Sequence, residues 1–233
     1  MTSTQIIAIV IFLVTMAAIM TEKLHRTVAA VAGALLLILT GVLSVESGFS
    51  YVDLNTLGVL IGMMLFVAVV KNSGIFEYIA IKAAKIAKGR PWPLMVLFAL
   101  ITAVLSAFLD NVTTVLLIGP MTLAITSMLR INPIPFFMTQ IMASNIGGTA
   151  TLIGDPPNIM IGSAAGLSFT DFIPNTGVAV LFVLAATIVC FYFIYGRKLH
   201  VEPEAMDSIL QLDENKAIKD RSLLIKSVVM ILL

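Results

Sequence analysis

The sequence has few charged residues and almost no cysteine. Asp, Glu, Lys and Arg make up 12% of its 233 residues, against about 25% in soluble domains. A single cysteine, Cys190, excludes a disulfide framework or a thiolate metal cluster built within this chain. The net charge of +1, without a basic patch, argues against nucleic acid as a partner. The Gly-x-x-x-x-Gly-Lys motif of nucleotide hydrolases is also missing.

Most of the chain is apolar. Hydrophobic residues make up 59% of it, and its mean hydropathy is +1.06. Runs of about 18 nearly uncharged residues are long enough to cross the ~30 Å hydrocarbon core of a bilayer as helices. We therefore expect an all-α polytopic membrane protein. The predicted apolar spans and arms are residues 5–20, 28–43, 54–70, 94–109, 115–129 and 176–195.

The short connections predict the orientation. Lys and Arg concentrate in residues 22–26, in residues 71–90, at Arg130 and in residues 197–198, whereas residues 44–53 and 168–175 contain acids and no basic residue. Because basic loops stay in the cytoplasm, we expect a multi-pass protein of the inner or plasma membrane with its N-terminus outside. Residues 75–88 alternate apolar residues and lysines at helical spacing, which predicts an amphipathic helix in the cytoplasmic interface or a short cytoplasmic connector.

A first polar island interrupts residues 91–129. This segment starts and ends on the basic side, so it enters and returns, either as two full spans or as a re-entrant hairpin. Its turn reads "LDNVTT", and either Asp110 or Asn111 would cap the following helix. An ionisable residue within membrane-embedded sequence marks a candidate functional site. The alternative is that Asp110 only turns the chain in water at the outer surface.

A second island, "ASNIGGTATLIGDPPN", covers residues 143–158. Residues 135–166 would measure about 48 Å as one helix, too long for one span and too short for two. We expect a helix that ends near Gly147 and Gly148 and restarts at Asp155-Pro156. Unwound backbone at membrane depth must line protein or a cavity, and its carbonyls suit Na⁺ while helix N-termini suit an anion. Close helix packing is an alternative reason for Gly147-Gly148 alone.

Together, "LDNVTTVLL" and "ASNIGGTATLIGDPPNIMIG" resemble the ion transporter superfamily, and most of all its group of arsenite permeases, NhaD-type Na⁺/H⁺ antiporters and the melanosomal P protein. Citrate and dicarboxylate carriers are more distant relatives. The resemblance implies inverted repeats, each with a re-entrant hairpin and an unwound helix whose tips meet at the binding site. The substrate- and ion-binding residues that it implies here are Asp110, Asn111, Thr113, Thr114, Asn145, Gly147, Gly148, Thr149, Thr151, Asp155 and Asn158. A Na⁺ ion would lie at Asn111, Asn145 and Thr149.

The resemblance also implies a domain layout. Residues 1–196 would form the first transporter repeat, with the re-entrant hairpin at 91–129 and the broken helix at 133–166. Residues 197–222 would be a cytoplasmic linker, and residues 223–233 would start a truncated second repeat. The expected partners are membrane lipid, a small ion or anion, the missing C-terminal repeat and a second copy in a homodimer, but no nucleic acid.

We therefore expect a secondary active transporter and not an enzyme. Its substrate would be arsenite, antimonite or another small inorganic or organic anion, moved by alternating access, with Na⁺ or H⁺ as coupling ion and no cofactor. The alternative is a Na⁺/H⁺ antiporter that uses Asp110 or Asp155. A distant alternative is an intramembrane aspartyl protease, although Leu152-Ile153-Gly154 before Asp155 does not match the Gly-x-Gly-Asp of such enzymes. A non-transporting helical scaffold is a further alternative.

Overall fold

The computed structural model describes residues 2–232, and these residues form helices and connecting turns without a strand. The predicted all-α membrane class is confirmed. Within the described residues, four helices are long and apolar enough to cross a membrane, at Ser3–Met20, Leu54–Lys71, Asn111–Met128 and Phe169–Gly196. The chain divides into two compact units, Met1–Leu54 and Asn55–Leu233. Each unit is described by itself.

The first unit is a helical pair followed by a short helix. It consists of α1 (Ser3–Met20), α2 (Arg26–Leu39) and α3 (Val45–Ser50). Thr2 and Gln5 form a reciprocal capping box at the start of α1. Helix α2 ends four residues before the predicted end of its span, because the chain turns at Gly41, where φ is +74°. No residue of α1 is buried within the chain, as suits a helix that faces lipid.

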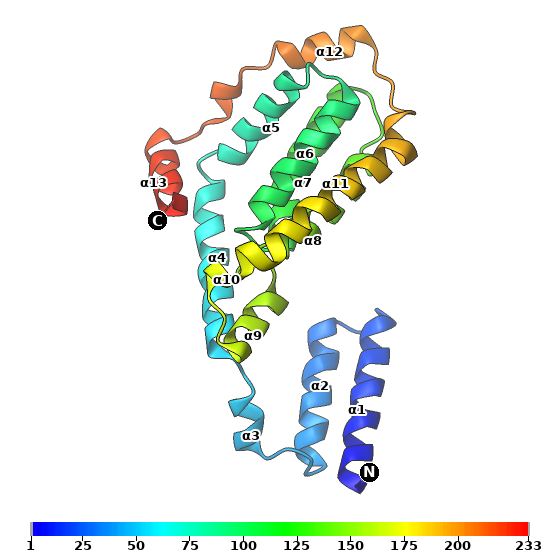
Figure 1. Cartoon of the computed structure of the whole chain (residues 1–233), viewed down its shortest axis with the longest axis vertical. Coiled ribbons are helices and arrows are strands. Elements are labelled where there is room, and N and C mark those ends of the chain that lie inside the picture. Colours follow the sequence, from blue (N-terminus) through cyan, green and yellow to red (C-terminus); the bar gives the residue numbers. More distant parts are fainter. Residues whose placement is uncertain (1, 233) are drawn as a thin grey trace. The chain divides into compact units, whose positions relative to one another are not determined.

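The second unit is built around three helices, α6 (Pro91–Ser106), α7 (Asn111–Met128) and α8 (Ile134–Gly148) (Figure 1). Helix α8 packs chiefly on α6, and also on α7 and on α11 (Val178–Phe191). The rings of Phe98 and Phe136 meet edge to face in the buried core, with their centroids 6.5 Å apart. Helix α4 (Leu54–Lys71) joins this unit through Val67 and Val70, which are buried.

Both predicted interruptions are present. Residues 107–110 separate α6 from α7, and residues 149–155 separate α8 from α9 (Pro156–Ala165). With 15 and 10 residues, α8 and α9 measure about 22 and 15 Å. Neither half spans the ~30 Å hydrocarbon core alone. The re-entrance of the hairpin, its depth and the repeat layout stay predictions.

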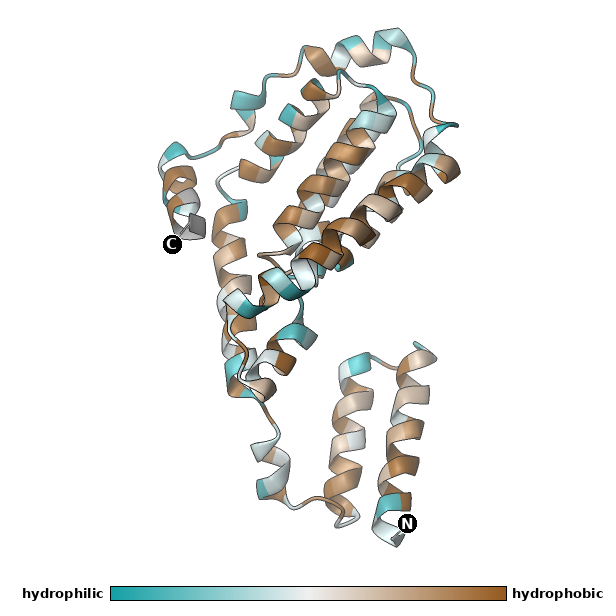
Figure 2. Ribbon diagram, viewed as in Figure 1, coloured by the Kyte–Doolittle hydropathy of each residue, from teal (hydrophilic) through white to brown (hydrophobic). Residues whose placement is uncertain are grey.

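The last long apolar segment is one continuous helical element. It comprises α10 (Phe169–Phe172), the π-helical turn η1 (Ile173–Gly177), α11 (Val178–Phe191) and a second π-helical turn, η2 (Tyr192–Gly196). Figure 2 shows α11 as strongly hydrophobic along its length. The element starts seven residues earlier than predicted, because Ser168 and Asp171 form a capping box at its beginning.

Helix α5 (Ile75–Ile86) forms within the expected amphipathic segment, and its position relative to a membrane stays a prediction. Its buried residues include Phe76, Ala80 and Ala84, and it packs on α6 and α7. Ile86, the last residue of the helix, is 63% exposed. The helix is therefore a packed part of the second unit. The remaining elements lie at the end of the chain, after η2. They are α12 (Pro203–Leu210), the 3₁₀ turn η3 (Glu214–Ala217) and α13 (Arg221–Leu232).

Candidate functional site

The tip of the α6–α7 hairpin is ordered by Asp110. Its carboxylate accepts a hydrogen bond from the Thr113 backbone N–H at 2.9 Å, so it caps α7 as the sequence predicts. The buried Thr114 hydroxyl donates to the Asp110 carbonyl at 2.9 Å. These bonds fix the first turn of α7 and place Asn111 at its first position.

The end of α8 meets this tip. The Asn111 side-chain Nδ2 donates to Asn145 Oδ1 at 2.8 Å, although the two residues are 34 positions apart. Asn145 Nδ2 donates in turn to the Ile141 carbonyl one helical turn earlier, which fixes the orientation of the amide. The asparagine pair flanks an open hollow of about 240 Å³, whose walls also include Val112, Val115, Leu116, Ile141 and Ser144.

Two predicted site residues hold the break in shape. Thr151 Oγ1 donates to the Ala107 carbonyl at the hairpin turn and accepts from the Gly154 N–H at 3.2 Å. Asn158 Nδ2 donates to the carbonyls of Thr151 at 2.9 Å and Gly148 at 3.3 Å. These two carbonyls, which an ion could otherwise use, already accept hydrogen bonds from within the chain.

Glycines allow the break to approach the hairpin. A Cβ added to Gly147 would lie 2.6 Å from the Ala103 Cα, and one added to Gly154 would lie 2.6 Å from the Ser106 carbonyl oxygen. Such distances are too short for any side chain. Gly147 therefore serves close packing of α8 on α6, the alternative that the sequence left open, while the break follows directly after Gly148.

Asp155 takes the predicted position before α9, with Pro156 as the first helical residue, but its side chain makes no capping hydrogen bond. It is partly buried, and it belongs to the break, in which Thr151 contacts the hairpin turn that ends at Asp110. Thr149 follows α8 directly, and its hydroxyl donates to the Ile146 carbonyl at 2.7 Å. Four positions after Asn145, Thr149 lies on the same side of that helix end.

Sequence reasoning missed two buried serines and one buried pair. Ser106 Oγ donates to the Ser144 carbonyl at 2.7 Å, one residue before Asn145, and both serines are buried. Gln140 Nε2 donates to Thr122 Oγ1 at 2.8 Å between α8 and α7. A glutamine within an apolar run was a usable signal, whereas small serines are common in membrane helices and gave none.

The charge at the site is acidic. Residues 91–128 and 134–165, which form the hairpin and the broken helix, contain no Lys, Arg or His. Helix α7 and α9 direct backbone N–H groups from their N-termini, and α8 directs carbonyl groups from its C-terminus. Within residues 2–232 no group of three or more His, Cys, Asp or Glu could hold a metal ion. Ions would therefore be bound by amide, hydroxyl, carbonyl and isolated carboxylate oxygens.

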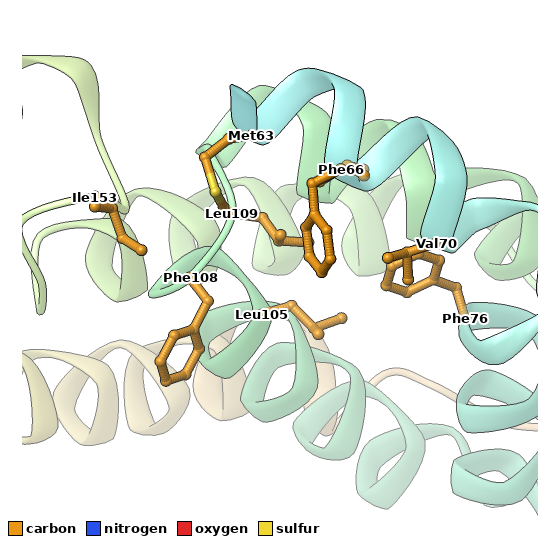
Figure 3. A pocket seen from close by; sticks show the side chains of 9 residues that line it. Met63, Phe66, Val70, Phe76, Leu105, Phe108, Leu109 and Ile153 are labelled. Carbon is orange, nitrogen blue, oxygen red and sulfur yellow. The ribbon is translucent and has the colours of Figure 1, made fainter. Parts of the chain in front are cut away.

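An apolar pocket lies beside the hairpin tip (Figure 3). It measures about 230 Å³, and all the residues that line it are apolar. Because it offers no oxygen or nitrogen ligand from a side chain, it does not suit an ion. Its walls come from α4, α5, the end of α6, the hairpin turn and the break, namely Met63, Phe66, Val67, Val70, Phe76, Leu105, Phe108, Leu109 and Ile153.

Comparison with known proteins identifies the family of this chain. A family model described as "Citrate transporter" matches residues 16–233. The chain belongs to the citrate transporter family. The family and the mycobacterial relatives below carry the names of transporters or of a membrane protein and not of enzymes, which removes the protease alternative.

Relatives of this citrate transporter family member include a 46 kDa membrane protein of Mycobacterium leprae, 42% identical over 98% of this chain and 54% of its own length. An uncharacterised transporter of Mycobacterium tuberculosis (strain H37Rv) is 41% identical over 95% of this chain and 52% of its own length. The human P protein is 38% identical over 79% of this chain and 23% of its own length. The chain thus spans about half the length of the mycobacterial relatives, and the predicted resemblance is confirmed.

Proposed function

We propose that the protein is a secondary active transporter that moves a small anion by alternating access. The hairpin tip and the break between α8 and α9 would form one wall of its binding site. The observation that carries this proposal is the 2.8 Å hydrogen bond between Asn111 and Asn145, which joins the N-terminus of one arm to the end of a half-length helix. Helix ends that converge inside apolar sequence are the usual construction of ion and substrate sites in such transporters.

The charge of the site bears on what it holds. An anion would meet no basic side chain on the hairpin or the broken helix, so it would depend on the N–H groups of α7 and α9 and on a bound cation. Oxygen atoms of Asn111, Asn145 and Thr149 would supply ligands for Na⁺, a hard cation. We therefore propose that Na⁺ or H⁺ binds in this half and lowers the cost of bringing in the anion.

The site residues divide into two groups by their contacts. Asp110, Asn111, Asn145, Thr149 and Asp155 have side chains at the hairpin tip or at the helix ends, and we propose that they contact the ion or substrate. The remaining predicted residues shape the backbone of the tip and the break, and these are Thr113, Thr114, Gly147, Gly148, Thr151 and Asn158.

A Na⁺/H⁺ antiporter is the second candidate. The observation that favours it is that the hairpin turn and the break, which contact each other through Ala107 and Thr151, each carry a carboxylate, Asp110 and Asp155, and two ionised carboxylates that share a site repel each other. A proton or a Na⁺ ion between them would relieve this repulsion, and competition between the two would exchange them. An anion would then be unnecessary for turnover.

Flux measurements on the full-length protein in liposomes test both proposals. With an imposed Na⁺ gradient, uptake of radiolabelled citrate and of arsenite is followed together with internal pH. Citrate is the first probe because the family model carries its name. Uptake of either anion that falls in Asn111→Ala and Asn145→Ala supports the anion transporter. Proton movement that needs Na⁺ and Asp110 or Asp155, without anion, supports the antiporter.

Absence of both signals from folded, correctly inserted protein, over these probes and over phosphate and succinate, would contradict transport of small anions and support a scaffold. A variant with Asn175→Ala is the matched control, because this exposed asparagine bonds only to the Asp171 carbonyl. It should retain full flux.

We also propose a multi-pass arrangement with the N-terminus outside and the basic connections in the cytoplasm, in the inner or plasma membrane, and assembly as a homodimer. Impermeant labelling of single cysteines placed in residues 22–26 and 168–175 checks the orientation. The first group should react only from the cytoplasmic side and the second only from the outer side.

A further inference from the structure

The segment 203–219, here called the strap, was expected to be part of a plain linker between repeats. In the structure it is docked along α5 by apolar, polar and backbone contacts. We propose that the strap clamps α5 and so restrains the hairpin that follows it. The effect on transport rate rests on the proposed function, whereas the docking itself does not.

The strap has a buried apolar anchor. Ile209 of α12 is fully buried, and it belongs to the same core cluster as Ala84 of α5, Leu94 of α6 and Leu129 at the end of α7. Burying an isoleucine side chain is worth about 1.5–3 kcal/mol relative to leaving it in water. A flexible tether would not place such a residue in the core. In Figure 1 the strap follows the outer side of α5.

Polar contacts continue this docking along η3. Lys85 Nζ lies 2.6 Å from Glu214 Oε2 and also donates to the Leu212 carbonyl at 3.2 Å. Both side chains of this ion pair are largely shielded, with exposed fractions of 32% and 23%. The contact therefore fixes η3 more firmly than an ion pair on the open surface would.

A second set of contacts lies at the beginning of α5. The Lys219 backbone N–H donates to the Ser73 carbonyl at 3.1 Å, and Lys219 Nζ lies 3.4 Å from Glu77 Oε1. The other carboxylate oxygen of Glu77 is buried and has no hydrogen-bond partner within the described residues. Loss of Lys219 would leave this half-buried carboxylate without its counter-charge, which is costly.

The strap also covers both turns at which the chain enters and leaves α5. These turns contain left-handed residues, Gly74 with φ +82° before the helix, and Lys88 with φ +53° and Gly89 with φ +66° after it. Ala217 and Lys219 abut Gly74 so closely that a Cβ there would overlap the Ala217 carbonyl. Met206 abuts Gly89, where a Cβ would lie 2.9 Å from the Met206 Cα.

Because of where α5 lies in the chain, docking of the strap restrains the hairpin. Helix α5 connects α4 to the hairpin whose tip carries Asp110 and Asn111. A change in the angle between α4 and the hairpin would have to occur at the two turns that flank α5. With the strap docked, rotation at either turn breaks packing with Met206 or with Ala217. Undocking of the strap is therefore required before α5 can reorient.

Cysteine labelling of the full-length protein tests the docking. In a background in which Cys190 and any other native cysteine are replaced by serine, Ile209→Cys reports whether the anchor is buried, and the exposed Asp207→Cys gives the rate for an open position. We expect maleimide to label the Ile209 position at least about tenfold more slowly, because a buried group reacts only when its segment opens. Equal rates at the two positions would overturn the docking.

Charge variants then test the clamp. Lys85→Glu should accelerate labelling at position 209, and the exchange Lys85→Glu with Glu214→Lys should restore protection. Lys82→Glu is the comparison variant, since this lysine contacts Tyr78 and acts on Glu214 only through its charge, without an ion pair, so it should accelerate labelling less than Lys85→Glu does. Hydrogen exchange of residues 203–219 in the chain with its native Ile209 gives a second reading that does not depend on the cysteine. Lys85→Glu and Lys82→Glu with the same exchange rates would contradict the ion-pair clamp.

Transport is measured separately on the same variants. We expect Lys85→Glu to change the maximal rate of uptake by about threefold or more while the KM stays within about twofold, since the strap lies away from the site and acts on a conformational step. A strap that undocks without any change in rate would overturn its control of the hairpin. Because labelling and hydrogen exchange need no substrate, they test the docking of the strap even if no flux of any probe is found.

Discussion

The helical pair α1–α2 and the helices α6–α8 are both apolar, yet they are packed differently. In residues 2–54 only Ala29 and Gly33 are buried. The second group buries many polar side chains, namely Thr102, Ser106, Thr114, Thr122, Thr126, Thr139, Gln140 and Ser144. The difference shows that mean hydropathy does not reveal which membrane helices form a polar interior. The helices with buried polar groups are those that carry the candidate site.

Burying these polar side chains costs little free energy because most of their hydroxyls donate hydrogen bonds to carbonyls of their own helix. Thr126 donates to the Thr122 carbonyl and Thr139 to the Pro135 carbonyl, each four residues earlier. Small hydroxyl residues then allow helices to approach closely, and only a few bonds cross between helices. Those few, from Ser106 and from Gln140, fix the register that brings Asn145 to Asn111.

The largest effect is expected where this packing is tightest. Gly147→Ala would place a methyl group against the backbone of Ala103, which cannot move aside, whereas Gly33→Ala meets only the side chain of Thr15. We expect Gly147→Ala to cost about 1–3 kcal/mol or to prevent folding, and Gly33→Ala to cost less. Thermal unfolding in detergent, followed by the single tryptophan, Trp92, measures both.

Gly62→Ala is the control for this comparison, because a Cβ there has no atom within 4 Å. It should be neutral or slightly stabilising, since alanine is the better helix former. If Gly147→Ala unfolds at the same temperature as Gly62→Ala, the two regions do not differ in the way the structure indicates.

A smaller effect is expected at the asparagine pair. Asn145→Ala and Asn111→Ala each remove the bond between the hairpin tip and α8, and we expect each to lower flux about tenfold, since a hydrogen bond contributes about 0.5–1.5 kcal/mol. The double variant should lose no more than the worse single variant, because both remove the same contact. If the loss of flux in the double variant equals the product of the two single losses, the two asparagines have independent roles.

A still smaller effect separates bonds between helices from bonds within one helix. Thr122→Val removes the partner of Gln140 and should cost about 0.6 kcal/mol, the average for such bonds in membranes, and at most about 1.7 kcal/mol. Thr15 bonds only to the Ile11 carbonyl of its own helix, at 2.8 Å. Thr15→Val should therefore change stability by less than about 0.5 kcal/mol. Unfolding in mixed detergent compares the two, and equal costs would contradict the distinction.

The smallest effect is expected at the ion pair of the strap, outside both helical groups. The hydrogen bond from Lys85 holds the pKa of Glu214 below its ordinary value. The stabilisation that this carboxylate gives is present above the unfolded pKa of about 4.3 and is lost as pH falls through the lower folded pKa. Protection of the strap from hydrogen exchange, corrected for intrinsic rates, should stay level from about pH 8 to 5 and fall only below about pH 4. Glu214→Gln should abolish this fall in protection at low pH.

Local features of the site could be predicted from the sequence. The Asp110 cap, the end of α8 at Gly148 and the start of α9 after Asp155 follow from short-range preferences of Asp, Gly and Pro. The start of α10 was misjudged because a capping box at Ser168 lay in a segment that was interpreted as an acidic loop. The segment that covers the outer side of α5 could not be predicted either, since it lies more than 100 residues away in the sequence.

What the sequence determined by itself is the membrane class, the two interruptions and the identity of the polar residues, because these depend on composition and on contacts between near neighbours. The tertiary structure decided which of those residues meet. The pairing of Asn111 with Asn145, the tie from Ser106 to Ser144 and the docking of Ile209 depend on which helix faces are opposed. Because the helices are apolar on nearly every side, hydropathy does not specify which of their faces pack against each other. The packing of glycines and small hydroxyl residues specifies these faces.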